Sequence, residues 1–266
     1  MKFAFLGYSA EEYWNAMSPS EQQAMLENCF TYDKKLLSDG HMLADGTALQ
    51  PSRAAKTLRW QEGAAVVTDG PYAETKEQLG GYGLLEARDM AHAVGLMAKH
   101  PGLHYGAVFE IRPINEEMLQ RHAASVAARR SRVPAAAGPQ VRFVALGYIS
   151  GSGWDSITPD ERDAMLQQCT AFDEARIQNG QWQSGIALEG PQSAKTVRAK
   201  AGQVAVTDGP FAETKEYLGG VVILTLKDMN EGIALLSKHP AIAYGVVMEL
   251  RPTAEEVCKI WDALRS

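Results

Sequence analysis

The stretch "TDGPYAETKEQLGG" occupies residues Thr68 to Gly81, and "TDGPFAETKEYLGG" occupies residues Thr207 to Gly220. Only two of the fourteen positions differ. In both copies Asp-Gly-Pro predicts a sharp turn after a strand, because Asp bonds back to the chain, Gly accepts a positive φ and Pro fixes its own φ. The closing Gly-Gly pair then lets the backbone re-enter a sheet. A turn-rich, charged stretch that occurs twice indicates two similar units in one chain.

The repeat extends over most of the sequence. "FAFLGY" at Phe3–Tyr8 returns as "FVALGY" at Phe143–Tyr148, and "YGAVFEIRP" at Tyr105–Pro113 returns as "YGVVMELRP" at Tyr244–Pro252. Repeats of this length indicate fused domains rather than a solenoid of short units. The chain accordingly divides into a first repeat at 1–113, a helical linker at 114–140, a second repeat at 141–252 and a C-terminal helix at 253–266.

Each repeat has the same pattern of secondary structure. Its opening strand is followed by a helix whose N-cap is Ser18 or Thr158, with Pro next and a Glu that completes a capping box. "KTLRWQEGAAVVT" predicts two short strands around a Gly-containing turn. A second helix begins after Asp89 or Asp228, and a last strand closes the repeat. The order strand, helix, short strands, helix, strand is that of a ferredoxin-like α+β unit.

A ferredoxin-like unit covers one face of its sheet with helices and leaves the other face to be buried elsewhere. Two fused copies can pack sheet against sheet, as in a two-fold dimer. The sequence therefore predicts an α+β protein in which two ferredoxin-like repeats form an intramolecular dimeric α+β barrel.

Composition limits the function classes. The 266 residues carry 26 basic and 32 acidic side chains, a formal charge of −6. Without a dense cationic stripe outside the linker, direct nucleic-acid binding is not expected. No run approaches the roughly 20 apolar residues of a membrane helix, so no membrane partner is expected.

Location and cofactors follow from the same survey. The N-terminus turns acidic before any long apolar run, which does not fit a signal peptide. Three cysteines without a secretory signal favour reduced thiols and a cytoplasmic location. The sequence offers no nucleotide fingerprint and no close metal-ligand spacing, so no cofactor and no metal are expected.

The hallmark "TDGPFAETKE" at Thr207–Glu216, with "KTVR", "LGG" and "ELRP" around it, resembles the YCII-related superfamily and specifically its DGPF-domain branch. In the first copy Tyr72 replaces the Phe of the hallmark. The resemblance covers both repeats and implies a dimeric α+β barrel. It also implies an enzyme-like superfamily with a suspected catalytic His/Asp pair and a lyase-type dehydrochlorination in one branch. DGPF proteins are further associated with extracytoplasmic-function sigma factors, which implies a regulatory context.

The closing strands carry charged pairs. Glu110 and Arg112 are two residues apart and share one strand face, which would point toward the sister sheet. Such a pair could line a pocket and hold an anionic small molecule, with Arg as a fixed fork. The alternative is a structural ion pair at a strand end. The same candidate substrate-binding site includes Tyr8, which ends the first strand and whose phenol could reach this region. The second-repeat equivalents are Tyr148, Glu249 and Arg251.

The repeated loop supplies further candidates. Asp69, Glu74 and Lys76 could be held over a pocket, since loops on rigid scaffolds often carry function. The alternative is a solvated connection whose charges satisfy each other. The second-repeat equivalents are Asp208, Glu213 and Lys215.

Two histidines are the candidate proton carriers. His100 and His239 each precede a Pro after the second helix, and imidazole titrates near neutral pH. We expect Asp69 and Asp208 to share proton transfer with them. Asp33 and its equivalent Asp173, on the first helix, are alternative partners. Some relatives carry the suspected Asp where His stands here, so the family dyad does not transfer directly, and a helix C-terminal residue favoured by the dipole remains the structural alternative.

Two function classes follow. The first is a small-molecule enzyme with acid/base residues in a pocket between the repeats, acting on an unidentified substrate for which an anion is one candidate. The second is a non-catalytic ligand-sensing or interaction module in sigma-factor regulation. Homo-oligomerisation beyond the intramolecular pair is left open.

Overall fold

The computed structural model describes residues 1–73, 75–120, 124, 139–151, 157–200, 202–211 and 216–265. Within them the chain forms two six-stranded sheets, in the orders β10-β9-β6-β1-β5-β2 and β4-β3-β12-β7-β11-β8. We call these the first and second sheets, after the repeat that supplies four of the six strands. The first-repeat strands of the first sheet are β1 (Lys2–Ala10), β2 (Met42–Ala48), β5 (Glu77–Glu86) and β6 (Val108–Pro113). The second-repeat strands of the second sheet are β7 (Val141–Ser150), β8 (Trp182–Ala187), β11 (Glu216–Leu226) and β12 (Val247–Pro252).

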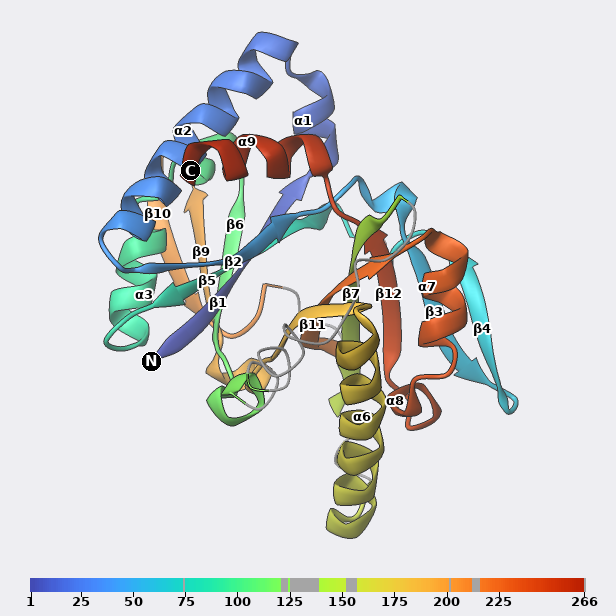
Figure 1. The fold of residues 1–266 in the computed structure, drawn as a ribbon. Helices are drawn as coiled ribbons and strands as arrows, with labels where there is room; N and C mark the ends of the chain where they lie inside the picture. Colours follow the sequence, from blue (N-terminus) through green and yellow to red (C-terminus); the bar gives the residue numbers. More distant parts are fainter. Residues whose placement is uncertain are drawn as a thin grey trace.

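The remaining four strands form two hairpins that exchange between the repeats. The first-repeat hairpin lies beside β12 in the second sheet, where Thr57 is opposite Glu249. The second-repeat hairpin lies beside β6 in the first sheet, where Thr196 is opposite Glu110. Figure 1 shows both hairpins at the far edge of the other repeat's sheet. The hairpins are β3 (Lys56–Gln61) with β4 (Ala64–Asp69), and β9 (Lys195–Lys200) with β10 (Gln203–Asp208).

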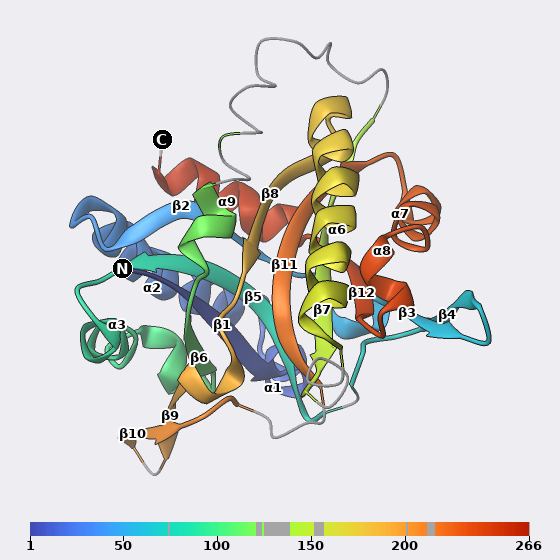
Figure 2. The ribbon, with the colours of Figure 1, turned by 90° about the horizontal axis from the view of Figure 1, so that it is seen from below.

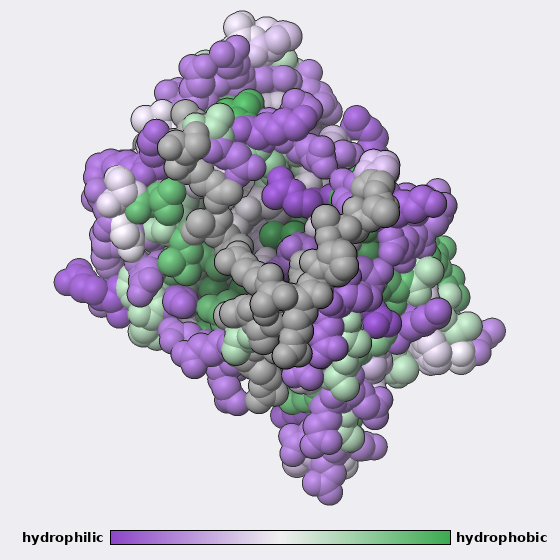
Figure 3. Space-filling view, in the orientation of Figure 1, coloured by the Kyte–Doolittle hydropathy of each residue, from purple (hydrophilic) through white to green (hydrophobic). Residues whose placement is uncertain are grey.

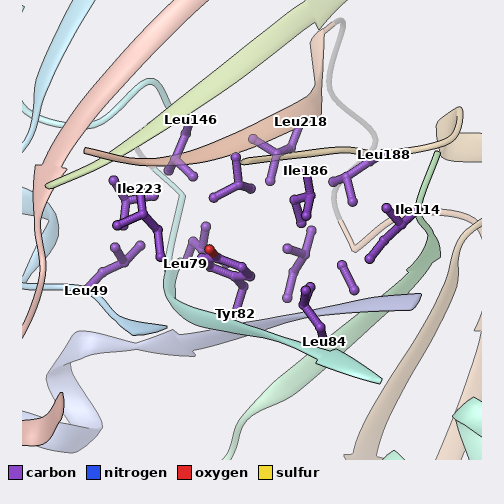
Figure 4. Packing of buried hydrophobic residues seen from close by; sticks show 14 residues of the cluster. Leu49, Leu79, Tyr82, Leu84, Ile114, Leu146, Ile186, Leu188, Leu218 and Ile223 are labelled. Atoms are coloured by element: carbon purple, nitrogen blue, oxygen red, sulfur yellow. The ribbon is translucent and has the colours of Figure 1, made fainter. Parts of the chain in front are cut away.

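A hydrophobic core fills the space between the two sheets (Figure 4). Alternate residues of the opening strands point into it, Ala4 and Leu6 from β1 and Val144 and Leu146 from β7. Their neighbours, such as Phe3, belong instead to the core on the helix side. The predicted packing of sheet against sheet within one chain, and with it the predicted α+β fold, is confirmed.

Helices cover the outer face of each sheet (Figures 1 and 2). The capping boxes of Ser18 with Glu21 and of Thr158 with Glu161 are present, and Asp89 and Asp228 cap the later helices, as predicted. Hydrophilic side chains cover most of the face in Figure 3, including the outside of the first long helix. Within the described ranges, the helices with at least six residues are α1 (Glu11–Ala16), α2 (Pro19–Ser38), α3 (Met90–Met97), α6 (Pro159–Asn179), α7 (Met229–Leu236) and α9 (Glu255–Arg265).

The C-terminal helix α9 crosses back to the first repeat. The backbone N–H of Ala254 donates to the carbonyl of Ala48 at 2.9 Å. The Trp261 ring lies 5.5 Å from that of Phe30 on α2, so α9 lies beside α2 (Figure 1). Among the described residues, no helix combines the length and apolar character needed to cross a membrane.

Candidate functional site

Two buried Glu–Arg pairs lie between the sheets, one on β6 and one on β12. Glu110 and Arg112 retain 2% and 1% of their accessible surface. Arg112 donates to the Glu110 carboxylate and, through Nη1, to the carbonyl of Leu218 in the second sheet. In the other pair Arg251 donates Nε to Glu249 at 2.8 Å and Nη1 to the Leu79 carbonyl at 2.7 Å. Each arginine therefore ties its own glutamate to the opposite sheet.

The repeated Asp-Gly-Pro-aromatic turn docks on these pairs across the repeats. The Tyr72 N–H donates to Oε2 of Glu249 at 2.8 Å, and the Tyr72 ring stacks on Tyr148 at 4.2 Å. The second copy does the same in reverse: the Phe211 N–H donates to Glu110 at 2.9 Å and its ring stacks on Tyr8 at 4.5 Å. The turn is thus a contact between repeats.

The cavity at this junction is small, about 60 Å³. It has room for roughly two waters at about 30 Å³ each. Tyr8 and Tyr148 line it, and burial, with Glu110 or Glu249 as the next cause, raises the pKa of both phenols far above the usual value for Tyr. The structure thus places the predicted Tyr, Glu and Arg residues around one cavity.

The arginine forks in that cavity are already occupied by glutamates and carbonyls. The interpretation as structural ion pairs, left open by the sequence, accounts for these contacts without a ligand. One donor is left over: within the described part of the chain, the buried Nε of Arg112 has no hydrogen-bond partner.

The loop residues lie away from this cavity. The side chains of Asp69 and Asp208 are 90% and 89% exposed at the ends of the exchanged hairpins, and each pairs with a Lys on the neighbouring strand, Lys56 or Lys195. Lys76 pairs with Glu12 at 3.1 Å on the surface. The other predicted loop residues, Glu74, Glu213 and Lys215, lie outside the described residues.

The structure does not bring Asp69 and His100 together, and this corrects the predicted acid/base pairing. His100 is buried under α2, and its Nε2 lies 3.1 Å from Oδ1 of Asp33. His239 makes the same contact with Asp173 at 3.3 Å. The physical reason is that each turn Asp ends an exposed edge hairpin of the exchanged pair, whereas each His belongs to the helix layer. The helix aspartates, named as alternatives by the sequence, are the partners.

The His100–Asp33 pair lines a much larger cleft on the helix side of the first repeat, of about 480 Å³. Its walls come mainly from the first sheet, from α1 and α2, and from α9 of the C-terminus, and the second sheet contributes Arg142 and Ile223. Figure 1 shows α2 and α9 on this side of β1, β2 and β5. The lining includes several aromatic side chains, among them Trp14, Phe30, Tyr105 and Trp261. Sequence reasoning missed this wall because nothing in the repeat pattern indicates that the last helix returns to the first repeat.

The hydrogen bonds of His100 settle its tautomer. The Gly102 N–H donates to Nδ1 at 3.0 Å, so in the neutral ring Nε2 carries the hydrogen and donates it to Asp33. Both ring nitrogens are therefore engaged. The Asp33 side chain keeps 12% of its surface exposed and lines the cleft. Its carboxylate, not the imidazole, is the group with a free position for a ligand.

Cys29 lies one helical turn before Asp33 and also lines the cleft. Burial, assisted by Asp33, raises the pKa of its thiol to about 12. The thiol stays protonated near neutral pH, which fits a core residue and not a nucleophile.

Comparisons with known proteins agree with the repeat. The family described as "YCII-related domain" matches residues 1–117 and 141–253. An uncharacterized protein of Rhizobium meliloti (strain 1021) is 35% identical over 94 residues, which span 35% of this chain and 75% of the relative.

Among solved structures, a mutant chlorite dismutase from Candidatus Nitrospira defluvii aligns over 100% of this chain and 95% of its own, with 8% identity and a TM-score of 0.44. Another mutant of that enzyme, in complex with cyanide, covers the same shares with 7% identity and a TM-score of 0.45. Because the YCII match covers both repeats, the chain belongs to the YCII-related domain family, as a tandem of two such domains.

Proposed function

We propose that the protein binds a small, largely apolar molecule in the cleft of the first repeat and exchanges a proton with it through Asp33. The observation that carries the proposal is the position of Asp33, held by His100 through one oxygen while its side chain lines the cleft. A candidate general base must lie within reach of the proton that it takes, and Asp33 is the acidic side chain that the buried histidine orients.

The cleft has the properties of a small-molecule site. Its volume of about 480 Å³ lies within the usual range of about 300–1,000 Å³. Its lining is mainly apolar and aromatic, with a few polar groups such as Asn15 and Thr47. By contrast, the junction between the sheets is small, and its ion pairs are already satisfied.

In this proposal the two members of the pair have different roles. Asp33 takes the proton from the ligand on its free oxygen, exchanges it with water and returns a proton from the solvent to the ligand. His100 is a positioning residue, because its two nitrogens are engaged by Asp33 and Gly102. Removal of a proton next to a leaving group is how a lyase-type elimination begins, so the proposal accommodates the chemistry that the family resemblance implies.

The test has two stages. A thermal-shift screen of planar phenols, aryl ketones and aryl acids identifies ligands, because binding to the folded state raises apparent stability. NMR in D₂O then measures deuterium incorporation at the carbon next to the carbonyl of the aryl ketones, because the O–H protons of phenols and acids exchange with water without a catalyst. We expect exchange by the wild type and its loss in Asp33→Asn with binding retained. Asp173→Asn is the matched control and keeps the activity. Exchange at the wild-type rate in Asp33→Asn would refute the role of Asp33.

The second function class uses the same cleft without chemistry. A wild-type protein that binds ligands but exchanges no proton would favour a ligand sensor. The association with a sigma factor stays a prediction, tested by co-purification with and without residues 116–132. Most of that segment lies outside the described residues.

A further inference from the structure

The two repeats keep the same His–Asp pair but build different walls around it. The pair is His100 with Asp33 in the first repeat and His239 with Asp173 in the second. Since the polar centre is duplicated, a difference in the surrounding volume decides whether both repeats can hold a ligand.

Three positions on the sheet side of the cleft carry larger side chains in the second repeat. Ser9 of β1 corresponds to Ile149 of β7, because each lies opposite the equivalent residue of the next strand, Gln78 or Tyr217. In the same way Met42 corresponds to Trp182, opposite Leu85 or Leu224. The third position is Ala107, which becomes Val246. All three first-repeat residues line the cleft.

The larger side chains occupy the space over the second sheet. Ile149 lies so close to Gly219 that a Cβ added to Gly219 would clash with the Ile149 side chain. A Cβ added to Gly185 would lie 2.6 Å from the Trp182 ring. In the first repeat the equivalent of Gly219 is Gly80, which lines the cleft. A Cβ added to Gly80 would have its nearest atoms 3.7 Å away, so there is room beside it.

Those second-repeat residues belong to one packed core. Trp182 and Val246 are buried in the helix-side cluster, and Ile149, Cys169 and Phe172 pack against it. Met165 on α6 is also buried, with 3% of its surface exposed. At another pair of positions the total side-chain volume is similar in the two repeats. In the first repeat the Phe5 ring lies over Gly83, and the second repeat has Ala145 and Val222 at these positions.

We propose that the repeats have divided roles: the first binds one planar aromatic molecule per chain, while the second fills the equivalent space with Ile149 and Trp182 and serves as core. The inference rests on the proposed function and names its ligand class and stoichiometry. The rings of Trp14, Phe30 and Trp261 offer flat apolar contact surfaces. The lining carries three carboxylates, Asp33, Glu11 and Asp262, and one arginine, Arg142. This balance of charge favours a neutral ligand over an anion.

The test uses 2-naphthol, a planar neutral aromatic alcohol that fluoresces, in calorimetric and fluorescence titrations of the full chain. We expect one equivalent to bind per chain. Ser9→Ile and Met42→Trp introduce the second repeat's own residues, and each should weaken binding about tenfold or more, because a filled pocket rejects extra volume. Ile149→Ser and Asp173→Asn are the controls and should bind as the wild type does. Circular dichroism and thermal unfolding check that each variant is folded.

Each outcome decides a separate point. Two equivalents per chain, or unchanged affinity in folded Ser9→Ile and Met42→Trp, overturn the division of roles and leave the proposed function standing. Loss of binding in Asp173→Asn also overturns it. If the wild type binds neither 2-naphthol nor any aryl ligand of the screen, the planar aromatic class and this inference fail, whereas Asp33-dependent exchange on a non-aromatic ketone would still support the proposed function.

Discussion

At the scale of single residues, the buried Glu–Arg pairs set the geometry of the junction. Each glutamate accepts from an arginine on its own strand and from the backbone of a turn in the other repeat. Each arginine in turn reaches a carbonyl of the opposite sheet. Because these polar contacts are directional, we expect them to favour one arrangement of the two sheets.

We expect Arg251→Met to lower the free energy of unfolding by about 3–5 kcal/mol, because it leaves the Glu249 charge buried and unpaired. The double variant Glu249→Leu/Arg251→Met removes both charges and should recover much of that loss. Urea denaturation of the single and double variants measures the difference. A single variant within about 1 kcal/mol of the wild type would show that the pair is not an essential part of the junction.

The buried phenols predict a pH dependence. The pKa of Tyr8 and of Tyr148 is raised in the folded state, mainly by burial. Above about pH 10 the unfolded chain loses these protons while the folded chain keeps them. The contribution of the two phenols to the free energy of unfolding is therefore fully present below that pH and is lost as the pH rises. Absorbance at about 295 nm should show that Tyr8 and Tyr148 are among the tyrosines that resist titration until unfolding, and Tyr8→Phe should lower the number of resistant tyrosines by one. An unchanged number of resistant tyrosines in Tyr8→Phe would contradict this.

At the scale of secondary-structure elements, α9 forms one wall of the cleft although it follows the second repeat in sequence. Its Trp261 ring contacts Phe30 on α2, and its Cys258 Sγ lies 3.2 Å from the Thr47 hydroxyl of β2. The helix is therefore part of the first-repeat site, and its loss would open the cleft on one side.

We expect Trp261→Ala to weaken 2-naphthol binding up to about tenfold, since an aromatic contact contributes about 0.5–1.5 kcal/mol beyond the area that it buries. Trp261→Phe keeps a ring and should retain most of the affinity. Fluorescence titration compares the two. Equal affinity in Trp261→Ala and the wild type would place the ligand away from α9.

At the scale of the whole molecule, the hairpin exchange makes each repeat incomplete alone. The first sheet takes two of its six strands from the second repeat, and the inter-sheet core needs both sheets. We expect residues 1–117 alone to form no stable monomer, but a homodimer in which two copies exchange hairpins. Sedimentation at several concentrations measures the association. A folded monomer with the full chain's thermal stability would show that the exchange is dispensable.

Much of the local structure could be predicted from the sequence. The capping boxes at Ser18 and Thr158, the Asp-Gly-Pro turns and the strand face shared by Glu110 and Arg112 depend on neighbours within a few residues. The candidate site was predicted less well. His100 was identified, but Asp69 was expected as its partner and Asp33 is the residue that the fold brings to it.

The sequence by itself determined that there are two repeats, that each is an α+β unit, and that one sheet face of each needs cover, because periodicity and turn chemistry are local properties. Only the tertiary structure decided which repeat each hairpin joins and where α9 returns. The two repeats offer nearly identical strands, so local preferences do not distinguish a partner within the repeat from one across it. The choice depends on contacts between residues far apart in the chain, such as Tyr72 with Glu249 and Trp261 with Phe30.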